Sequence, residues 1–239
     1  MTHIVGRTEP GASDGRAAAR LLARPLAGLF ALAVLGFGYI VYILWPRWPE
    51  PPVAPDTPPL PIIVAGVVFN VPPAAIRTAV QRRAGTQERI DLVYLWPALT
   101  PPETTAKTSP AGARPADRIF VTIAGGDGTL PPAERLKVIY PRYTESVASA
   151  GPGGLTLVPF RSGTPYQAED LLFDQAAPDR FLLRCSRAGR GAIPGVCLHE
   201  QRIGSADVTV RFPRHWLADW PNVLAGIDRL MAMLRPPGS

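Results

Sequence analysis

Two cysteines, Cys185 and Cys197, have a spacing that predicts a covalent link between them. Eleven residues separate them, mostly Arg, Gly and Ala, and Gly191 lies at the midpoint. If the apolar runs on both sides form a hairpin centred on Gly191, the two cysteines face each other directly. Paired cysteines in an oxidising compartment usually form a disulfide, and closing this loop would contribute about 3 kcal/mol to stability. We therefore predict a structural disulfide, because redox cysteines usually lie two residues apart at a helix start.

His199 and Glu200 are the first candidates for a metal site. A zinc hydrolase of the H-E-x-x-H type needs a second histidine one helical turn later, but Ile203 holds that position. The other histidines, His215 and His3, do not complete a set of zinc ligands. The segment around His199 also has the pattern of a strand rather than a helix. We therefore predict no metal site and no cofactor.

Residues 125–129, Gly-Gly-Asp-Gly-Thr, follow a predicted strand and precede a short predicted helix. They resemble the GGDGT signature of the diacylglycerol-kinase and NAD-kinase superfamily, in which glycines let the backbone approach phosphates. This resemblance would place Asp127 in the phosphate-binding loop of an enzyme. However, the following helix ends by Pro141, the preceding sequence lacks a regular βαβ unit, and the predicted compartment contains no ATP. A turn with positive φ angles explains the same residues without a ligand.

No residues complete a catalytic constellation elsewhere in the sequence. A G-x-S-x-G nucleophile motif is absent. Trp216 and Trp220 could form a carbohydrate or membrane contact, but their four-residue spacing on an amphipathic helix is typical of core residues. We predict a non-catalytic protein, with an enzyme of scattered site residues, including the loop at 125–129, as the alternative.

These residues follow a predicted membrane anchor at residues 26–45. The stretch LAGLFALAVLGFGYIVYILW contains no charge, and at about 1.5 Å per residue it would span about 30 Å, the thickness of a hydrocarbon core. The basic residues near it lie mainly on the N-terminal side: Arg7, Arg16, Arg20 and Arg24, against Arg47 beyond it. The positive-inside rule then predicts a cytoplasmic tail at 1–25 and a periplasmic C-terminal domain.

A cleaved signal peptide is the competing interpretation of this stretch. Its apolar core would be shorter, and the nearest small-residue cleavage site ends at Ala54, where Pro55 would hinder cleavage. No lipobox cysteine follows the stretch. The helix also has no G-x-x-x-G motif, so dimerisation through it is not predicted. We expect a single-pass protein of the bacterial inner membrane.

Residues 46–61 predict an extended linker between the anchor and the outer domain. Eight of these sixteen residues are proline, a composition that favours polyproline II and excludes a helix. At about 3.1 Å per residue, the segment would reach up to roughly 50 Å.

The net charge of +6 is dispersed, with no run of basic residues, so nucleic-acid binding is not predicted. An envelope protein is the expected partner besides the membrane itself.

Residues 62–239 predict an α+β domain with a mainly antiparallel sheet. The expected elements are a strand-like run at 61–71, a helix at 72–83, strands near 89–96 and 118–125 flanking a long loop at 97–117, and a short helix within 131–140. Five closely spaced apolar runs between 155 and 212 predict an antiparallel meander. A C-terminal amphipathic helix follows, in which Pro221 marks a kink or the first turn of a new helix.

Several stretches of this domain resemble a group of uncharacterised membrane-anchored proteins of alphaproteobacteria. The stretches lie at 67–77, 89–102, 135–143 and 197–220. The resemblance implies a bacterial inner-membrane setting and implies no activity, cofactor or active site.

Overall fold

The computed structural model describes residues 14–44, 53–54, 57–102, 117–126, 128, 130–187 and 195–236. The chain divides into two compact units, Met1–Glu50 and Pro51–Ser239. The predictions for residues 1–13, for most of the linker, for most of the 97–117 loop and for Asp127 fall outside the described residues.

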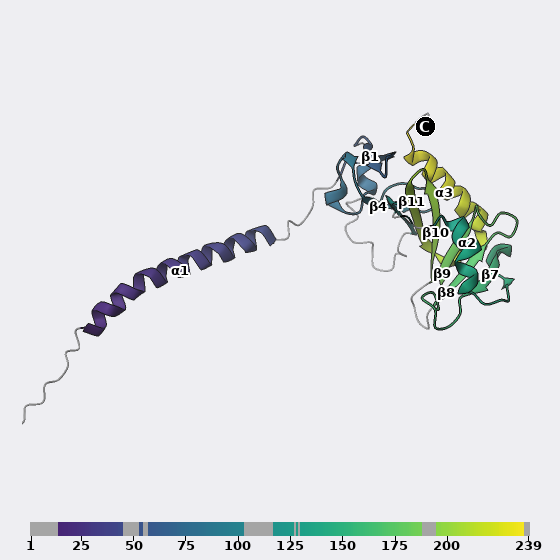
Figure 1. Ribbon diagram of the computed structural model, residues 1–239. Helices are drawn as coiled ribbons and strands as arrows, with labels where there is room; N and C mark the ends of the chain where they lie inside the picture. Colours follow the sequence, from purple (N-terminus) through teal and green to yellow (C-terminus); the bar gives the residue numbers. More distant parts are fainter. Residues whose placement is uncertain are drawn as a thin grey trace, which may run out of the picture. The chain divides into compact units, whose positions relative to one another are not determined.

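The first unit contains one long helix, α1 (Asp14–Leu44), drawn in purple in Figure 1. Large apolar side chains on it are exposed over more than four turns, from Leu29 through Phe37 to Leu44. Among the side chains that the structure describes, no helix offers a long enough apolar stretch to cross a membrane.

The second unit begins with a small sheet in which the predicted strand-like run is a hairpin. The run folds into β1 (Leu60–Val64) and β2 (Val67–Val71), and β3 (Gly85–Thr86) pairs in parallel with β1. Ala65 and Gly66 form the turn with φ angles of 49° and 79°, which is the geometry of a tight two-residue hairpin. β1 starts at Leu60, within the range 46–61 that was predicted as linker.

The helix predicted at 72–83 is wrong. The segment contains only two 3₁₀ turns, η1 (Pro73–Ala75) and η2 (Ala79–Gln81). Ile76 between them has an extended backbone and forms a bridge with Leu92. Its side chain is 1% exposed, so burying it at the sheet outweighs the local preference for a helix.

The main sheet has eight strands in the order β4-β5-β11-β10-β9-β8-β7-β6, and every neighbouring pair is antiparallel. The strands are β4 (Arg89–Leu95), β5 (Arg118–Gly125), β6 (Ser149–Ala150), β7 (Thr156–Pro159), β8 (Glu169–Phe173), β9 (Leu182–Ser186), β10 (Val196–Ile203) and β11 (Ala206–Pro213). The five runs predicted as a meander are β7 to β11, each beside the next. This confirms an α+β domain with mainly antiparallel sheets.

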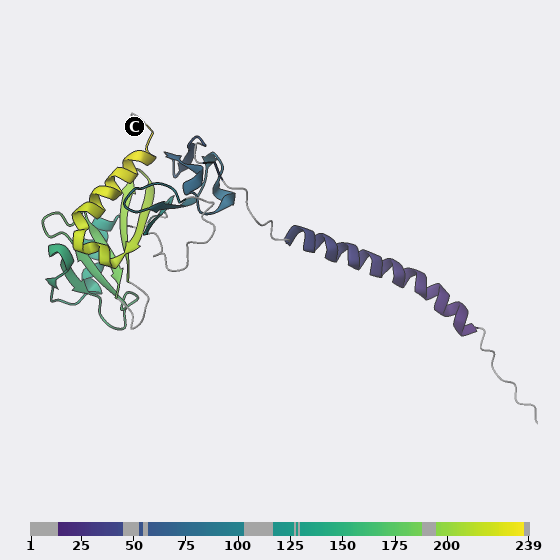
Figure 2. The same ribbon diagram turned by 180° about the vertical axis from the view of Figure 1, so that it is seen from behind.

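One face of the main sheet packs against the C-terminal helix. A 3₁₀ segment, η5 (Arg214–Asp219), leads into α3 (Trp220–Leu234), with Pro221 in the first turn of the new helix. The buried face of α3, including Leu224, Ile227 and Leu230, joins the main core. Both views show this yellow helix beside the green strands (Figures 1 and 2).

The residues that the structure describes cover the other face of the sheet only in part. The helix α2 (Pro132–Val138) and the 3₁₀ turn η3 (Tyr140–Arg142) contribute Leu136 and Tyr140 to a second apolar cluster. Phe160, Leu171 of β8 and Leu182 of β9 are its other buried members, while Leu172 and Leu183 belong to the main core. Alternation along the strands therefore assigns the second cluster to the outer face of β8 and β9.

Candidate functional site

The structure contains the predicted disulfide between Cys185 and Cys197. The two residues are directly opposite in the register of β9 and β10, their Cα atoms are 4.0 Å apart, and both side chains are fully buried. Leu183 pairs with His199 in the same register, as a hairpin centred on Gly191 requires. Because the sulfur atoms lie in the main core, the bond is structural rather than part of a surface redox site.

His199 is a core residue and does not meet the other metal candidates. His199 is 2% exposed, and its ring lies beside Phe181. The Nδ1 atom is 3.2 Å from the carbonyl oxygen of Leu182. A carbonyl can only accept, so Nδ1 carries the proton and donates it. Burial lowers the pKa of His199 despite this hydrogen bond, so the ring is held neutral.

Glu200 and His215 lie elsewhere in the fold. Glu200 points to the opposite face from His199 and pairs with Arg135 (Nη1–Oε2 3.1 Å) and Arg184. His215 is exposed and lies edge-on to Trp216. Within the described ranges, no group of three or more His, Cys, Asp or Glu side chains could hold a metal ion.

The Gly-rich segment at 125–129 connects an antiparallel strand to a short helix. Both neighbours of β5, namely β4 and β11, run antiparallel to it. Gly128 has a φ of 80°, as a turn requires, and α2 has seven residues. These features match a turn and not the βαβ lead-in of a kinase, while Asp127 and Thr129 lie outside the described residues.

Trp216 and Trp220 have different environments. Trp216 is 8% exposed and stacks on Trp96 with centroids 5.0 Å apart, which confirms its predicted place in the core. Trp220 stacks on Phe181 at 5.2 Å, and its Nε1 donates to the carbonyl oxygen of Gly153 at 2.9 Å. The indole of Trp220 is therefore fixed in place at the edge of a shallow pocket.

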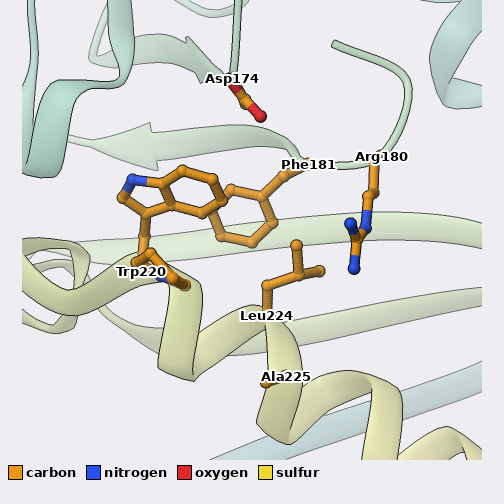
Figure 3. A pocket seen from close by; sticks show the side chains of 7 residues that line it. Asp174, Arg180, Phe181, Trp220, Leu224 and Ala225 are labelled. Atoms are coloured by element: carbon orange, nitrogen blue, oxygen red, sulfur yellow. The ribbon is translucent and has the colours of Figure 1, made fainter. Parts of the chain in front are cut away.

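This pocket has a volume of about 180 Å³ and is shown in Figure 3. Its lining is Asp174, Arg180, Phe181, Trp220, Pro221, Leu224 and Ala225. The charged groups at its rim already have partners within the domain: Arg180 pairs with Asp228 at 3.6 Å, and Asp174 accepts from the Ala176 N–H at 3.0 Å. The pocket therefore offers little unpaired polarity to a ligand.

A second, larger hollow lies on the part of the outer face that the second apolar cluster leaves open. Its volume is about 330 Å³, and we call it the arginine groove. It is lined by Arg77, Arg118, Phe120, Val196, Arg211, Phe212 and Pro213. Strands β5, β10 and β11 supply all of these except Arg77, which comes from the segment between η1 and η2.

Arg77 is positioned by both its backbone and its side chain. Its N–H donates to the Asp91 carbonyl oxygen at 2.9 Å, which ties the segment to the edge strand β4. Its guanidinium carbon lies 5.0 Å from the ring centroid of Phe120, a cation–π arrangement. One cationic group of the groove is thus held over its aromatic floor.

The three arginines of the groove lack the ion pairs that neighbouring arginines make. Arg77, Arg118 and Arg211 are exposed, and none is within ion-pair distance of a carboxylate in the described part of the chain. Other arginines on the sheet or directly after its strands are paired: Arg89 with Asp91, Arg184 with Glu169, Arg187 and Arg214 with Asp170, and Arg202 with Asp207. The groove therefore concentrates unneutralised positive charge over an apolar floor.

The sequence analysis missed this groove, because it treated the arginines only as dispersed charge. A signal was present in β5, where Arg118 and Phe120 alternate with the buried Ile119 and Val121. That pattern indicates an outward-facing pair on one strand. Arg77 lies more than forty residues before Phe120 in the sequence, so no local pattern predicted its contact with the ring.

No protein-family model and no curated protein matches the chain. Among solved structures, Smlt3025, an immunity protein of the Stenotrophomonas maltophilia type IV secretion system, aligns with a TM-score of 0.51 and 17% identity over 79% of this chain and 100% of that one. This likeness shows a shared fold. The Neisseria meningitidis iron-regulated outer membrane lipoprotein FrpD aligns with a TM-score of 0.43 and 11% identity over 77% of this chain and 93% of its own.

Proposed function

We propose that this chain is a non-catalytic protein of the bacterial envelope, anchored in the inner membrane by residues 26–45, whose periplasmic domain binds a protein partner. The arginine groove is the observation that carries the binding role. Exposed cations without a carboxylate partner among the described residues, beside apolar surface, are typical of recognition surfaces. The fold shared with an immunity protein of a secretion system supports a protein as the partner.

The membrane anchor is supported by the sequence and by the exposed apolar side chains of α1. Of residues 26–45, the side chains of Leu26 and Ala27 and the whole of Trp45 fall outside the description. The remaining residues are helical, and those with large apolar side chains are mostly more than half exposed. Such a helix needs a covering, and a bilayer supplies one. The disulfide fits an oxidising periplasm.

A pair of alkaline phosphatase fusions tests the topology. The enzyme is active only outside the cytoplasm, so we expect activity when it follows Ser239 and none when it follows Arg20. The reverse pattern would overturn the proposed localisation.

Site-specific photocrosslinking in cells tests the binding role. A photoreactive amino acid is placed at Val196, which lines the groove and is 40% exposed, in the full-length chain, and a matched one at Arg229, which is exposed on α3. We expect one discrete adduct with another protein from position 196 and none from position 229. The absence of any protein adduct from position 196, together with normal membrane levels of the chain, contradicts a protein-binding function through the groove.

A further inference from the structure

We infer that the arginine groove takes an extended acidic segment of the partner, with carboxylates on alternate residues. This inference rests on the proposed binding function and adds the chemistry of the ligand. It follows from three features of the groove, namely the spacing of its arginines, the position of its aromatic ring, and the lack of a neutralising carboxylate among the residues that the structure describes.

The spacing comes from the register of the strands. Arg211 of β11 lies directly opposite Phe120 of β5, and Arg118 lies two residues before Phe120 on the same strand face. Arg118 and Arg211 are therefore diagonal neighbours, which lie about 7–8 Å apart, with their Cβ atoms somewhat closer. In an extended chain, side chains on one face repeat every two residues, or about 7 Å. Two carboxylates at positions i and i+2 of an extended segment can thus each meet one arginine.

The floor of the groove fits the rest of such a segment. Phe120 neighbours both arginines, and Arg77 lies over its ring. Val196 is 40% exposed and lies directly opposite Pro213 in the β10–β11 register, which extends the apolar surface beside the charges. The methylene groups of glutamate side chains would pack on this surface while their carboxylates reach the guanidinium groups.

Guanidinium groups also suit the carboxylate geometry. Each can donate two parallel hydrogen bonds to one carboxylate, and the paired arginines on the same sheet already bind carboxylates, as in Arg202 with Asp207. A phosphate of a lipid head group has related chemistry. It would need only one cluster of cations, however, and would not benefit from two arginines separated along an extended path.

Binding of short peptides to the full-length protein tests the inference. The probe is a fluorescein-labelled peptide of four Glu-Thr repeats, followed by fluorescence anisotropy. Two control peptides carry Gln in place of Glu, or the same residues arranged as a block of Glu followed by a block of Thr. We expect the alternating acidic peptide to bind most tightly, and the binding to weaken as salt is added.

Charge-reversal variants locate the binding. Arg118→Glu and Arg211→Glu should each raise Kd on the order of tenfold, because each replaces an attraction by a repulsion. Arg229→Glu on α3 makes the same charge change away from the groove and should change Kd by less than about twofold. Arg118→Gln and Arg211→Gln remove the attraction without adding a repulsion, so each should raise Kd by a smaller factor than the Glu variant at the same position. The unfolding midpoint of each variant checks that it is folded.

Equal binding of the Gln peptide, equal binding of the block peptide, or unchanged Kd in the Arg118 and Arg211 variants would each overturn the inference. Inorganic phosphate and glycerol phosphate serve as competitors. If either displaces the peptide at the peptide's own concentration, the groove is a phosphate or lipid head-group site instead.

The proposed function can fail separately. If the peptide binds as expected but photocrosslinking finds no protein adduct, the chemistry of the groove holds and the cellular function is wrong. If the double variant Arg118→Glu with Arg211→Glu keeps the same protein adduct, reported from an unchanged position such as Thr209, the binding function holds and the acidic-segment inference is wrong.

Discussion

Asp170 of β8 lies directly opposite Cys185 of β9 in the register of the sheet, so that a buried carboxylate sits beside the disulfide. The carboxylate accepts from Arg187 Nε at 2.8 Å and pairs with Arg214 Nη1 at 2.7 Å. Arg214 in turn donates to the carbonyl oxygen of Ser186. A covalent and an ionic link therefore act on the same end of the β9–β10 hairpin.

Removal of the disulfide should destabilise the domain without changing its fold. We expect the variant with both Cys185→Ser and Cys197→Ser to lose about 2–4 kcal/mol in free energy of unfolding, because the closed loop restricts the unfolded chain. Urea denaturation measures the loss, and a thiol assay on the wild-type protein from the periplasm should find no free thiol. A change in the double variant below about 0.5 kcal/mol would contradict a stabilising role.

The ionic link predicts a comparable loss. Asp170→Asn should lower the free energy of unfolding by about 2–4 kcal/mol. Breaking a fully buried ion pair can cost more than this, but the Arg187 side chain is 44% exposed and water can hydrate it. The change keeps the shape of the side chain and removes the charge that two arginines share. Asp179→Asn, at an exposed position, is the matched control and should change stability by less than about 0.5 kcal/mol.

The buried histidine predicts a pH dependence of stability. Burial lowers the pKa of His199 in the folded state, so below about pH 6.5 the unfolded chain binds a proton that the folded chain does not. The free energy of unfolding should therefore fall as the pH decreases from about 6.5 toward the lower folded pKa. His199→Gln removes this part of the pH dependence, whereas His215→Gln, at an exposed position, retains it. Parallel slopes in wild type and His199→Gln would refute the assignment.

Packing around Trp96 predicts that a normally favourable helix substitution is harmful. Replacing glycine by alanine inside a helix usually gains up to about 1 kcal/mol. At Gly226 of α3, however, the added Cβ would overlap ring carbons of Trp96, which is held by its stacking on Trp216. Because overpacking costs about 1–3 kcal/mol, we expect Gly226→Ala to lower the thermal midpoint. Thermal unfolding followed by circular dichroism measures this, and an increase in the midpoint would show that Trp96 moves aside.

Local sequence patterns were sufficient for the elements whose partners are close in the chain. The strands between 155 and 213 follow one another with connections of two to nine residues. Each therefore pairs with the next, and alternation alone predicts its buried face. In the same way, the cysteine spacing predicted the register of β9 and β10, and Pro221 indicated the start of α3. In each case the decisive interaction joins residues a few positions apart or on either side of one turn.

Tertiary structure decided the features that depend on distant residues. The segment at 72–83 has helical composition, but Ile76 forms an extended bridge with Leu92. The free energy gained by burying the Ile76 side chain exceeds the small free energy that a short helix would contribute. The hairpin turn at Ala65–Gly66 places alanine, a non-glycine residue, at positive φ, and the local sequence does not predict this conformation. The arginine groove exists because folding brings Arg77 over Phe120 and places β11 beside β5. The sequence by itself therefore determined the strand faces, the disulfide and the helix start. Only the packing of distant segments decided which arginines share a surface where the described residues supply no carboxylate partner.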